Sequence, residues 1–385
     1  MLVPKLRFKE FNDEWNKIKL SNIVTELNEK TKDTSNYPLW SLTLEDGVTP
    51  KTERYERGFL VKKEDNFKIV HYNNFVYNPM NLRLGAIAYH KEKIDISVSG
   101  YYNIFKIKNN FTIGFWDNYF KCPMMIKRYN NIATGSLVEK KRVHYSQFIE
   151  LSVPVPSEEE QIKISNLLVL LNKKIELQQR KIEVLKMYKR GLMQKIFGNT
   201  EINSWSTNIL RNILIPGSKV PVTDTSKYQK ITIKLNLQGI TKSNVNREMA
   251  DTRPFYIRRE NEIIIGKQNY FNGSIAILPK EFDGCICSNA IMSFSVNSNY
   301  LTKFVYYYIS QNNYIKRREY FANGTGQKEL SENDFLNFQI KVPSIDEQKH
   351  ITNILDNIDS KINLNVNIYN SLTKLKKSLL QQMFI

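Results

Sequence analysis

The chain has 385 residues, 41% of them hydrophobic and 24% charged, so it can form two or three globular domains, each with its own core. Its 56 Lys and Arg against 38 Asp and Glu give a formal net charge of +18, which indicates a polyanionic partner, with nucleic acid as the first candidate. The three cysteines favour a reducing cytoplasm. No apolar run approaches the ~18 residues of a membrane span, and the charged first twenty residues lack a signal-peptide core. We therefore expect no secreted, membrane-spanning or disordered protein.

Residues 1–154 are predicted to be a globular lobe of mixed helices and strands. Short β-like runs at 94–98 and 104–107 are interrupted by Gly and Pro, which is typical of curved sheets with long loops. Six cations and a Thr-Gly-Ser run, interleaved with aromatic and amide side chains, mark a basic surface. These candidates for DNA contact are Lys121, Lys127, Arg128, Thr134, Gly135, Ser136, Lys140, Lys141 and Arg142.

Residues 155–198 are predicted to be a long helix. Ser157 follows a proline and precedes Glu160 by three positions, which is the spacing of a capping box, and acidic residues in the first turn suit the helix dipole. Apolar residues then recur at steps of three and four as far as Gly198, which indicates a coiled-coil seam. At ~1.5 Å per residue this helix would be roughly 60 Å long.

Residues 199–341 are predicted to be a second mixed lobe, with β-like runs at 263–265, 275–278 and 292–296. Its candidate DNA contacts are Arg253, Arg258, Arg259, Lys267, Lys316, Arg317, Arg318, Gly324, Thr325, Gly326 and Gln327. Arg, Lys, Asn and Gln are the residue types that read base edges. The glycine-rich run at 324–327 could present backbone N–H groups to a phosphate, or it could be a plain connecting turn.

Residues 342–385 repeat the helix pattern, with Ser344 and Glu347 at the capping-box spacing. The residues expected to pair the two helices are Leu168, Ile175, Gln178, Ile182, Leu185, Lys189, Leu192, Leu355, Ile362, Asn365, Tyr369, Leu372, Lys376 and Leu379. Two of these seam positions are polar in both helices: Gln178 matches Asn365, and Lys189 matches Lys376. They are either tolerated polar residues near solvent or residues that fix register and orientation.

The two halves of the chain are repeats of one another. Residues 155–197 and 342–384 align without a gap at an offset of 187, and 16 of these 43 positions are identical. Upstream, Trp15, Leu20, Asn22 and Ile23 recur as Trp205, Leu210, Asn212 and Ile213 at an offset of 190. The stretches between these anchors resemble each other poorly. Each half is therefore a variable lobe followed by a more uniform helix.

The excess positive charge is concentrated in the lobes. Helix 157–197 carries nine Lys or Arg against five Glu, a net +4, and helix 344–385 carries five Lys against four acidic residues, a net +1. The other 302 residues therefore hold +13 of the +18. Neutralising phosphates requires such charge on a face or in a groove of each lobe.

Patterns that resemble catalytic or metal-binding motifs are weak. Asn78-Pro79-Met80 lacks the aromatic residue of an amino-methyltransferase motif, and no glycine-rich cofactor turn precedes it. Acidic-x-Lys triplets are common by chance, and Cys285-x-Cys287 has no second cysteine pair. We therefore expect neither a catalytic residue nor a metal site in this chain.

The repeated Trp-x4-Leu-x-Asn-Ile start, the Pro-Ser-x-x-Glu-Gln helix entries at 156–161 and 343–348, and the Gly-Thr-Gly-Gln run resemble a specificity subunit of a type I restriction-modification system. The resemblance covers essentially the whole chain. It implies an α/β (α+β) fold of two target-recognition domains in a pseudo-two-fold arrangement, at 1–154 and 199–341. Two long antiparallel coiled-coil helices, at 155–198 and 342–385, would separate them.

The resemblance also implies a non-catalytic bacterial or archaeal cytoplasmic protein that binds double-stranded DNA and two methyltransferase subunits, with two restriction-translocase subunits as further possible partners. S-adenosylmethionine would belong to the methyltransferase, ATP and Mg to the restriction subunit, and no cofactor to this chain.

Because the two lobes differ in sequence, we expect an asymmetric, bipartite DNA target. A helix of roughly 60 Å exceeds one DNA turn of ~34–36 Å, so two lobes could engage major grooves about a turn apart. The alternative is a non-enzymatic coiled-coil scaffold whose basic lobes bind RNA or another acidic partner. Binding by such a scaffold would weaken with salt for all nucleic acids alike.

Overall fold

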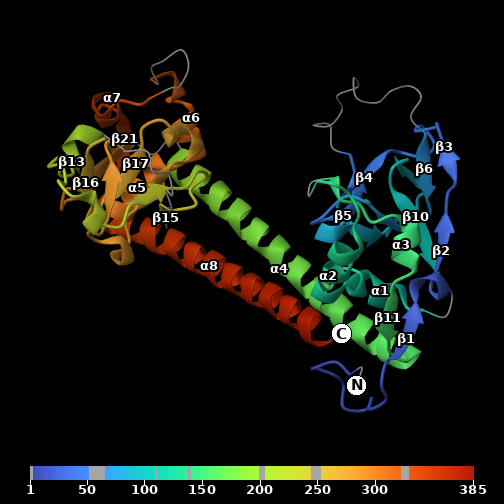
Figure 1. Ribbon diagram of the computed structural model, residues 1–385. Helices are drawn as coiled ribbons and strands as arrows, with labels where there is room; N and C mark the ends of the chain where they lie inside the picture. Colours follow the sequence, from blue (N-terminus) through green and yellow to red (C-terminus); the bar gives the residue numbers. More distant parts are fainter. Residues whose placement is uncertain are drawn as a thin grey trace. The chain divides into compact units, whose positions relative to one another are not determined.

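The computed structural model describes residues 3–51, 66–108, 111–137, 140–198, 204–243, 253–321 and 329–385, and the chain divides into two compact units (Figure 1). Unit 1 comprises Met1–Gln179 and Asn367–Ile385, and unit 2 comprises Arg180–Val366. Each unit contains one lobe and a part of both long helices. The division predicted from the sequence, into two lobes and two separate spacer helices, differs from these two units and stays a prediction.

Unit 1 is built on a four-stranded antiparallel sheet in the order β2-β10-β7-β8. These strands are Val24–Leu27, Asn103–Ile107, Phe75–Tyr77 and Ile87–Tyr89. Smaller sheets pair β1 (Asn16–Lys19) with β11 (Ser152–Val155), β4 (Trp40–Thr43) with β5 (Gly47–Pro50), and β3 (Lys30–Thr31) with β6 (Phe67–Val70) and β9 (Ile96–Ser99). The short helices are α1 (Ile113–Tyr119), α2 (Pro123–Ile132) and α3 (Tyr145–Ile149).

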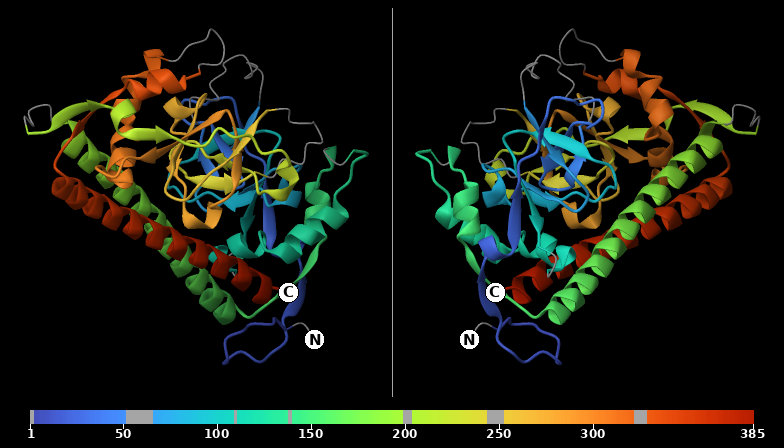
Figure 2. Two further views of the ribbon diagram at one scale, coloured as in Figure 1. Left: turned by 90° about the vertical axis from the view of Figure 1, so that its left-hand side faces the viewer. Right: turned by 90° about the vertical axis from the view of Figure 1, so that its right-hand side faces the viewer.

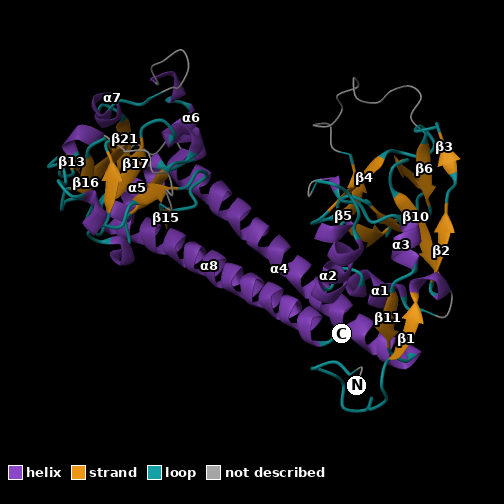
Figure 3. Ribbon diagram, viewed as in Figure 1, coloured by secondary structure: helices purple, strands orange, loops and turns teal. Residues whose placement is uncertain are grey.

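Unit 2 repeats this plan with a four-stranded antiparallel sheet in the order β13-β20-β17-β18. These strands are Leu214–Pro216, Ile291–Val296, Ile263–Gly266 and Ile275–Ile277. Two-stranded sheets pair β12 (Ser206–Ile209) with β21 (Gln339–Val342), β14 (Ile231–Ile233) with β15 (Ile240–Lys242), and β16 (Phe255–Ile257) with β19 (Ile286–Ser288). The short helices are α5 (Thr302–Ile309), α6 (Asn312–Lys316) and α7 (Glu332–Leu336). Strands and short helices mix in both lobes, as Figure 3 shows, so the predicted α/β (α+β) class is confirmed.

Both faces of the inner strands β7 and β17 of the central sheets are buried, which explains why these strands carry no charged or long polar residue. In β17, Ile263 and Ile265 join the main core of unit 2, whereas Ile264 points to a separate core on the opposite face. In β7, Phe75 and Tyr77 join one core of unit 1, whereas Val76 joins the other. Alternation with period two therefore supplies two cores from a single strand.

The β-like runs of the sequence are strands in the structure, with small differences at their ends. Runs 104–107, 263–265, 275–278 and 292–296 fall in β10, β17, β18 and β20. Run 94–98 begins two residues later than predicted, at Ile96 of β9. Ile94 is 51% exposed, and its carbonyl oxygen accepts a hydrogen bond from the His90 ring instead of a strand neighbour.

The two long helices are α4 (Glu158–Gly198) and α8 (Ile345–Gln382). α4 can be followed as one uninterrupted helix in both views of Figure 2. In unit 1, Leu168 near the start of α4 shares a core with Met383 just beyond α8, and in unit 2, Met193 near the end of α4 shares a core with Ile351 near the start of α8. The helices are therefore antiparallel, as predicted. None of the described helices is long and apolar enough to cross a membrane.

The second helix ends three residues earlier than the predicted 385. Leu6 donates its backbone N–H to the Gln382 carbonyl at 3.0 Å and so caps the last turn. Phe384 then packs against Phe115 and Tyr119 of α1, with ring centroids 5.5 and 5.4 Å apart. Burial of this aromatic side chain in unit 1 competes with continuation of the helix.

The repeated helix entry ties each long helix to its lobe. Ser157 Oγ accepts the Glu160 N–H at 3.4 Å, which is the predicted cap, but the Glu160 carboxylate does not complete a capping box. Instead it accepts two hydrogen bonds from Arg7, each 2.8 Å, and one from the Trp15 indole at 3.2 Å. In unit 2 the Glu347 carboxylate accepts the Trp205 indole N–H at 3.0 Å.

The glutamine that follows has the same role in both units. Gln161 Nε2 donates to the Pro156 carbonyl at 3.1 Å, and its Oε1 accepts the Thr112 N–H at 3.4 Å. Gln348 makes the equivalent bonds to Pro343 at 3.1 Å and Leu301 at 3.0 Å. In each unit the Glu-Gln pair therefore attaches the start of the long helix to the tryptophan that precedes the first strand of the lobe, Trp15 or Trp205, and to the segment before α1 or α5.

Candidate nucleic-acid interface

One loop of unit 1 brings six of the predicted DNA contacts together. Thr134 and Arg142 exchange backbone hydrogen bonds of 2.9 and 2.8 Å, which close the loop between them. Gly135 has φ +147°, and a Cβ there would lie 3.0 Å from the Lys140 carbonyl, so the backbone approaches itself closely. The loop presents Thr134, Gly135, Ser136, Lys140, Lys141 and Arg142, all exposed except the half-buried Lys141.

An aromatic side chain lies beside this loop. The Arg142 guanidinium is 5.6 Å from the ring centroid of Tyr101, which is 41% exposed. A cation held over an exposed ring suits both a phosphate and a stacked base. Lys127, on α2, is also exposed.

Four of the predicted contacts are instead engaged inside the lobes. Lys121 pairs with Asp117 at 2.6 Å. Arg258 is 3% exposed and donates to Cys287 Sγ at 3.0 Å and to the Ser218 carbonyl at 3.0 Å. A guanidinium buried in this way holds neighbouring segments together.

Arg128 and Arg318 form a matched pair of such contacts. Arg128 Nη1 donates to the Ser152 carbonyl at 2.5 Å, and Arg318 Nη2 donates to the Gln339 carbonyl at 2.9 Å. Ser152 begins β11 and Gln339 begins β21, so the same strand is held in both units. We therefore leave Lys121, Arg128, Arg258 and Arg318 out of the proposed interface.

The other predicted contacts of unit 2 are dispersed. Arg259, Lys316 and Arg317 are exposed, and Lys267 is half-buried with its Nζ 4.0 Å from a Glu329 oxygen. Arg253 is also exposed and lines the groove described next. Gly324, Thr325, Gly326 and Gln327 lie outside the described residues.

A polar groove of 600 Å³ lies in unit 2 and was not predicted from the sequence. Its walls come from β14, the ends of β17 and β19, and the segment before β16, which are far apart in the chain. Gln229, Lys230, Arg253, Gln268 and Asn269 supply its long polar side chains, and Lys230 lies 4.5 Å from the Phe255 ring centroid. No carboxylate occurs among the described residues that line it, so the groove suits a polyanion with base edges.

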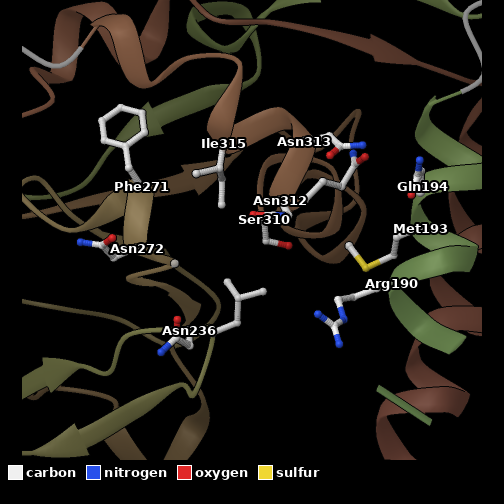
Figure 4. A pocket seen from close by; sticks show the side chains of 13 residues that line it. Arg190, Met193, Gln194, Asn236, Phe271, Asn272, Ser310, Asn312, Asn313 and Ile315 are labelled. Carbon is white, nitrogen blue, oxygen red and sulfur yellow. The ribbon is translucent and has the colours of Figure 1, made fainter. Parts of the chain in front are cut away.

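A second cavity of unit 2, of 460 Å³, lies against α4. Arg190, Met193 and Gln194 line one side, opposite Asn236 and Asn312, as Figure 4 shows. It holds one cation among many amides, so it fits a nucleic acid less well than the groove does.

Cys285, Cys287 and the Asn-Pro-Met run lie in environments that do not favour catalysis or metal binding. Burial raises the pKa of the Cys285 and Cys287 thiols, which disfavours the thiolate needed for metal binding or nucleophilic attack. Asn78 Oδ1 accepts the Met80 N–H at 3.0 Å and forms a tight turn. Among the described residues, no group of three or more His, Cys, Asp or Glu side chains could hold a metal ion.

All fourteen predicted helix-pairing residues are buried or half-buried in the structure, including the polar ones. Asn365 is 5% exposed, and its Nδ2 donates to the Lys361 carbonyl at 2.6 Å. Lys189 pairs with Asp359 at 2.6 Å. The role of Gln178 and Asn365 in fixing the register stays a prediction.

Residues 209–374, which cover most of the second lobe and α8, match the family model of the Type I restriction modification DNA specificity domain. This part of the chain is therefore similar to the type I restriction-modification specificity subunits, in agreement with the resemblance found in the sequence.

Two curated relatives come from Methanocaldococcus jannaschii. The MjaX specificity subunit of a type I restriction enzyme is 26% identical over 268 residues, and the MjaVIII specificity subunit is 23% identical over 259 residues. These matches cover 63% and 60% of this chain. The chain spans only about three fifths of the length of these relatives, 60% and 61%.

Two solved structures share the fold over 96% or more of the chain. A type I S subunit from M. genitalium has a TM-score of 0.61 at 15% identity and covers 100% of this chain and 99% of its own. A structure described for the assembly and conformational transition of the type I system has a TM-score of 0.56 at 14% identity, with 96% and 97% covered.

Proposed function

We propose that this protein is the DNA sequence-specificity subunit of a type I restriction-modification complex. In this proposal each lobe reads one half of an asymmetric, bipartite DNA target. The observation that carries the proposal is that both units share one arrangement of lobe and long helices but carry different polar surfaces. One surface is the loop 134–142 of unit 1, and the other is the groove of unit 2.

The difference between those surfaces supports an asymmetric target. The loop 134–142 presents three cations beside Tyr101, whereas the groove presents Gln229, Gln268 and Asn269 with Lys230 and Arg253. Amides and arginine can read base edges, and lysines suit phosphates. Two surfaces built from different side chains would select different bases.

The proposal assigns the chemistry to partner subunits. The chain would be a non-catalytic cytoplasmic protein that docks two methyltransferase subunits on its helices and that can take up two restriction-translocase subunits as well. The methyltransferase would supply S-adenosylmethionine chemistry, and the restriction subunit would supply ATP and Mg. Support comes from the family model that matches residues 209–374 and from the structure described for complex assembly in the type I system.

The test is to co-express the chain with the methyltransferase encoded beside it, in a host that lacks DNA methylation, and to sequence the methylated genome. We expect adenine methylation at one gapped motif whose two halves differ. A contiguous or palindromic motif would contradict the bipartite reading, and no new methylation from a soluble complex would favour the scaffold alternative.

Salt titration separates the same two functions in vitro. A specificity subunit keeps a large preference for one duplex as salt rises, because base contacts persist when phosphate contacts weaken. A basic scaffold loses affinity for every nucleic acid alike.

A further inference from the structure

The internal repeat gives an exact residue register between α1 and α5, because three aromatic contacts match in the two units. Phe384 contacts Phe115 and Tyr119, just as Phe197 contacts Phe304 and Tyr308. Trp15 likewise contacts Phe115 as Trp205 contacts Phe304. An offset of 189 therefore aligns α1 with α5, and the offset of 187 aligns α4 with α8.

In unit 2, the contact between α5 and the long helices is a closed ionic network. Lys189 lies 2.6 and 2.7 Å from the two Asp359 oxygens and 4.8 Å from the Tyr307 ring centroid. Tyr307 Oη lies 2.7 Å from both Asp359 and Asp356, and Lys303 pairs with Asp356 at 2.7 Å. The network thus contains two lysines and two carboxylates, so its charges balance.

The same positions of unit 1 have lost both carboxylates. Asp359 corresponds to Asn172, Asp356 to Val169, and Tyr307 to Asn118, whose Nδ2 donates to the Gly114 carbonyl instead. The lysine is kept, because Lys189 corresponds to Lys376. A cavity of 340 Å³ lies here, lined by Tyr89, Lys91, Gly114, Asp117, Asn118, Val169, Asn172, Lys173 and Glu176.

The surroundings of Lys376, next to this cavity, have an excess of positive charge. Lys376 is half-buried and, within the described residues, forms no ion pair, while Asp117 is engaged by Lys121 at 2.6 Å. Burial, with Lys121 and Lys91 nearby, lowers the pKa of Lys376. Lys91 and Lys173 of the lining are balanced in number by Asp117 and Glu176. The excess comes from Lys121 and Lys376, which are outside the lining but lie near Asp117. The ammonium of Lys376 lacks the carboxylate that its counterpart has.

We propose that the unit 1 cavity beside Lys376 is a docking site for an acidic side chain of a partner protein, which occupies the place that Asp359 holds in unit 2. The inference rests on the proposed function, in which that partner is one copy of the methyltransferase. The occupant is a carboxylate because unit 2 shows that group on the matching lysine. Identical partner copies then bind the two units unequally, since only unit 1 needs the partner's acid.

Two substitutions test the site from opposite directions. Lys376→Met removes the cation, and Asn172→Asp supplies within the chain the carboxylate that unit 2 has. Both are expected to weaken the binding of one of the two methyltransferase copies by about tenfold, as measured by native mass spectrometry and titration of the complex. Asn172→Asp should at the same time raise the melting temperature of the free subunit by about 2 °C, because it pairs Lys376 internally.

Lys377→Met is the matched control, because it removes the same charge from an exposed neighbour on α8. Equal losses for Lys377→Met and Lys376→Met, or wild-type docking of Asn172→Asp, would overturn the proposal. Loss of DNA affinity with unchanged docking would also overturn it, because the anion would then be a phosphate. If Lys376→Met fails to fold, Asn172→Asp decides alone. A wild-type chain that binds no methyltransferase overturns the proposed function itself.

Discussion

Glu160 and Glu347 occupy equivalent positions of the repeat, but their carboxylates have different hydrogen-bond partners. The Glu160 carboxylate is 1% exposed and pairs with Arg7, whose side chain is 11% exposed, in addition to Trp15. The pKa of Arg7 is raised, chiefly by its hydrogen bond to Glu160. Glu347 is exposed and accepts the hydrogen bond of Trp205. The same motif therefore stabilises the two units to different degrees.

Replacement of Glu160 by Gln should be much more destabilising than the same change at Glu347. Glu160→Gln removes the carboxylate that is hydrogen-bonded to the largely buried Arg7 guanidinium, which we expect to lower the free energy of unfolding of unit 1 by about 3 kcal/mol. Glu347→Gln keeps an oxygen acceptor for Trp205 and should cost less than about 1 kcal/mol. Hydrogen exchange of the buried amides in each unit measures both.

Glu159→Gln serves as the control, because Glu159 is exposed in the same helical turn. Equal protection of unit 1 in the Glu159→Gln and Glu160→Gln proteins would show that the Arg7 contact contributes little.

At the scale of the elements, the basic residues of the lobes fall into two groups. Those of the loop 134–142 are proposed to bind DNA, whereas the arginines that contact β11 and β21 stabilise the fold. Lys140 and Arg142 are exposed at one loop, whereas Arg128 and Arg318 donate to strand carbonyls. All four belong to basic clusters of the sequence. Only the contacts that they make in the folded protein distinguish an exposed cation from one that is hydrogen-bonded to a strand.

The double change Lys140→Ala, Arg142→Ala should weaken DNA binding without changing stability. Each phosphate contact contributes about 0.9 to the slope of log affinity against log salt, so the slope should fall by about 2. Arg128→Met should instead lower the melting temperature and leave the slope unchanged, because its guanidinium holds the start of β11. Binding titrations at several salt concentrations, with melting curves of both variants, measure these effects. The opposite pattern would exchange the two roles.

Sequence patterns predicted the parts of the fold that depend on local chemistry. The long helices follow from heptad spacing and Ser caps, and β17 follows from three consecutive isoleucines, since both signals lie within one segment. The ionic network of Lys189 and the groove of unit 2 could not be predicted, because each joins side chains from distant segments. The role of Glu160 was missed for the same reason, as Trp15 lies 145 residues away.

At the scale of the whole molecule, duplication followed by divergence explains both what the units share and where they differ. The helix entries, the central sheets and the Arg128 and Arg318 contacts are common to both, because they hold the lobe-and-helix plan. The groove of unit 2 and the Lys376 site are each described in one unit, and the counterpart of the loop 134–142, at 324–327, lies outside the described residues. At the Lys376 site the two units therefore differ where a partner is proposed to bind, whereas the residues that maintain the fold are retained.

If each unit reads its own half-site, a change in one surface should alter only one half of the target. Gln268 is exposed on the groove of unit 2, and an amide that contacts a base contributes about 1–3 kcal/mol of discrimination. Gln268→Ala should therefore relax one base position in one half-site, while the other half-site and the spacing stay unchanged in the methylated genome. Arg142→Ala in unit 1 is the matched variant, and any change in base preference that it causes should fall in the opposite half-site. Relaxation of both half-sites by Gln268→Ala would mean that the two units do not read DNA independently.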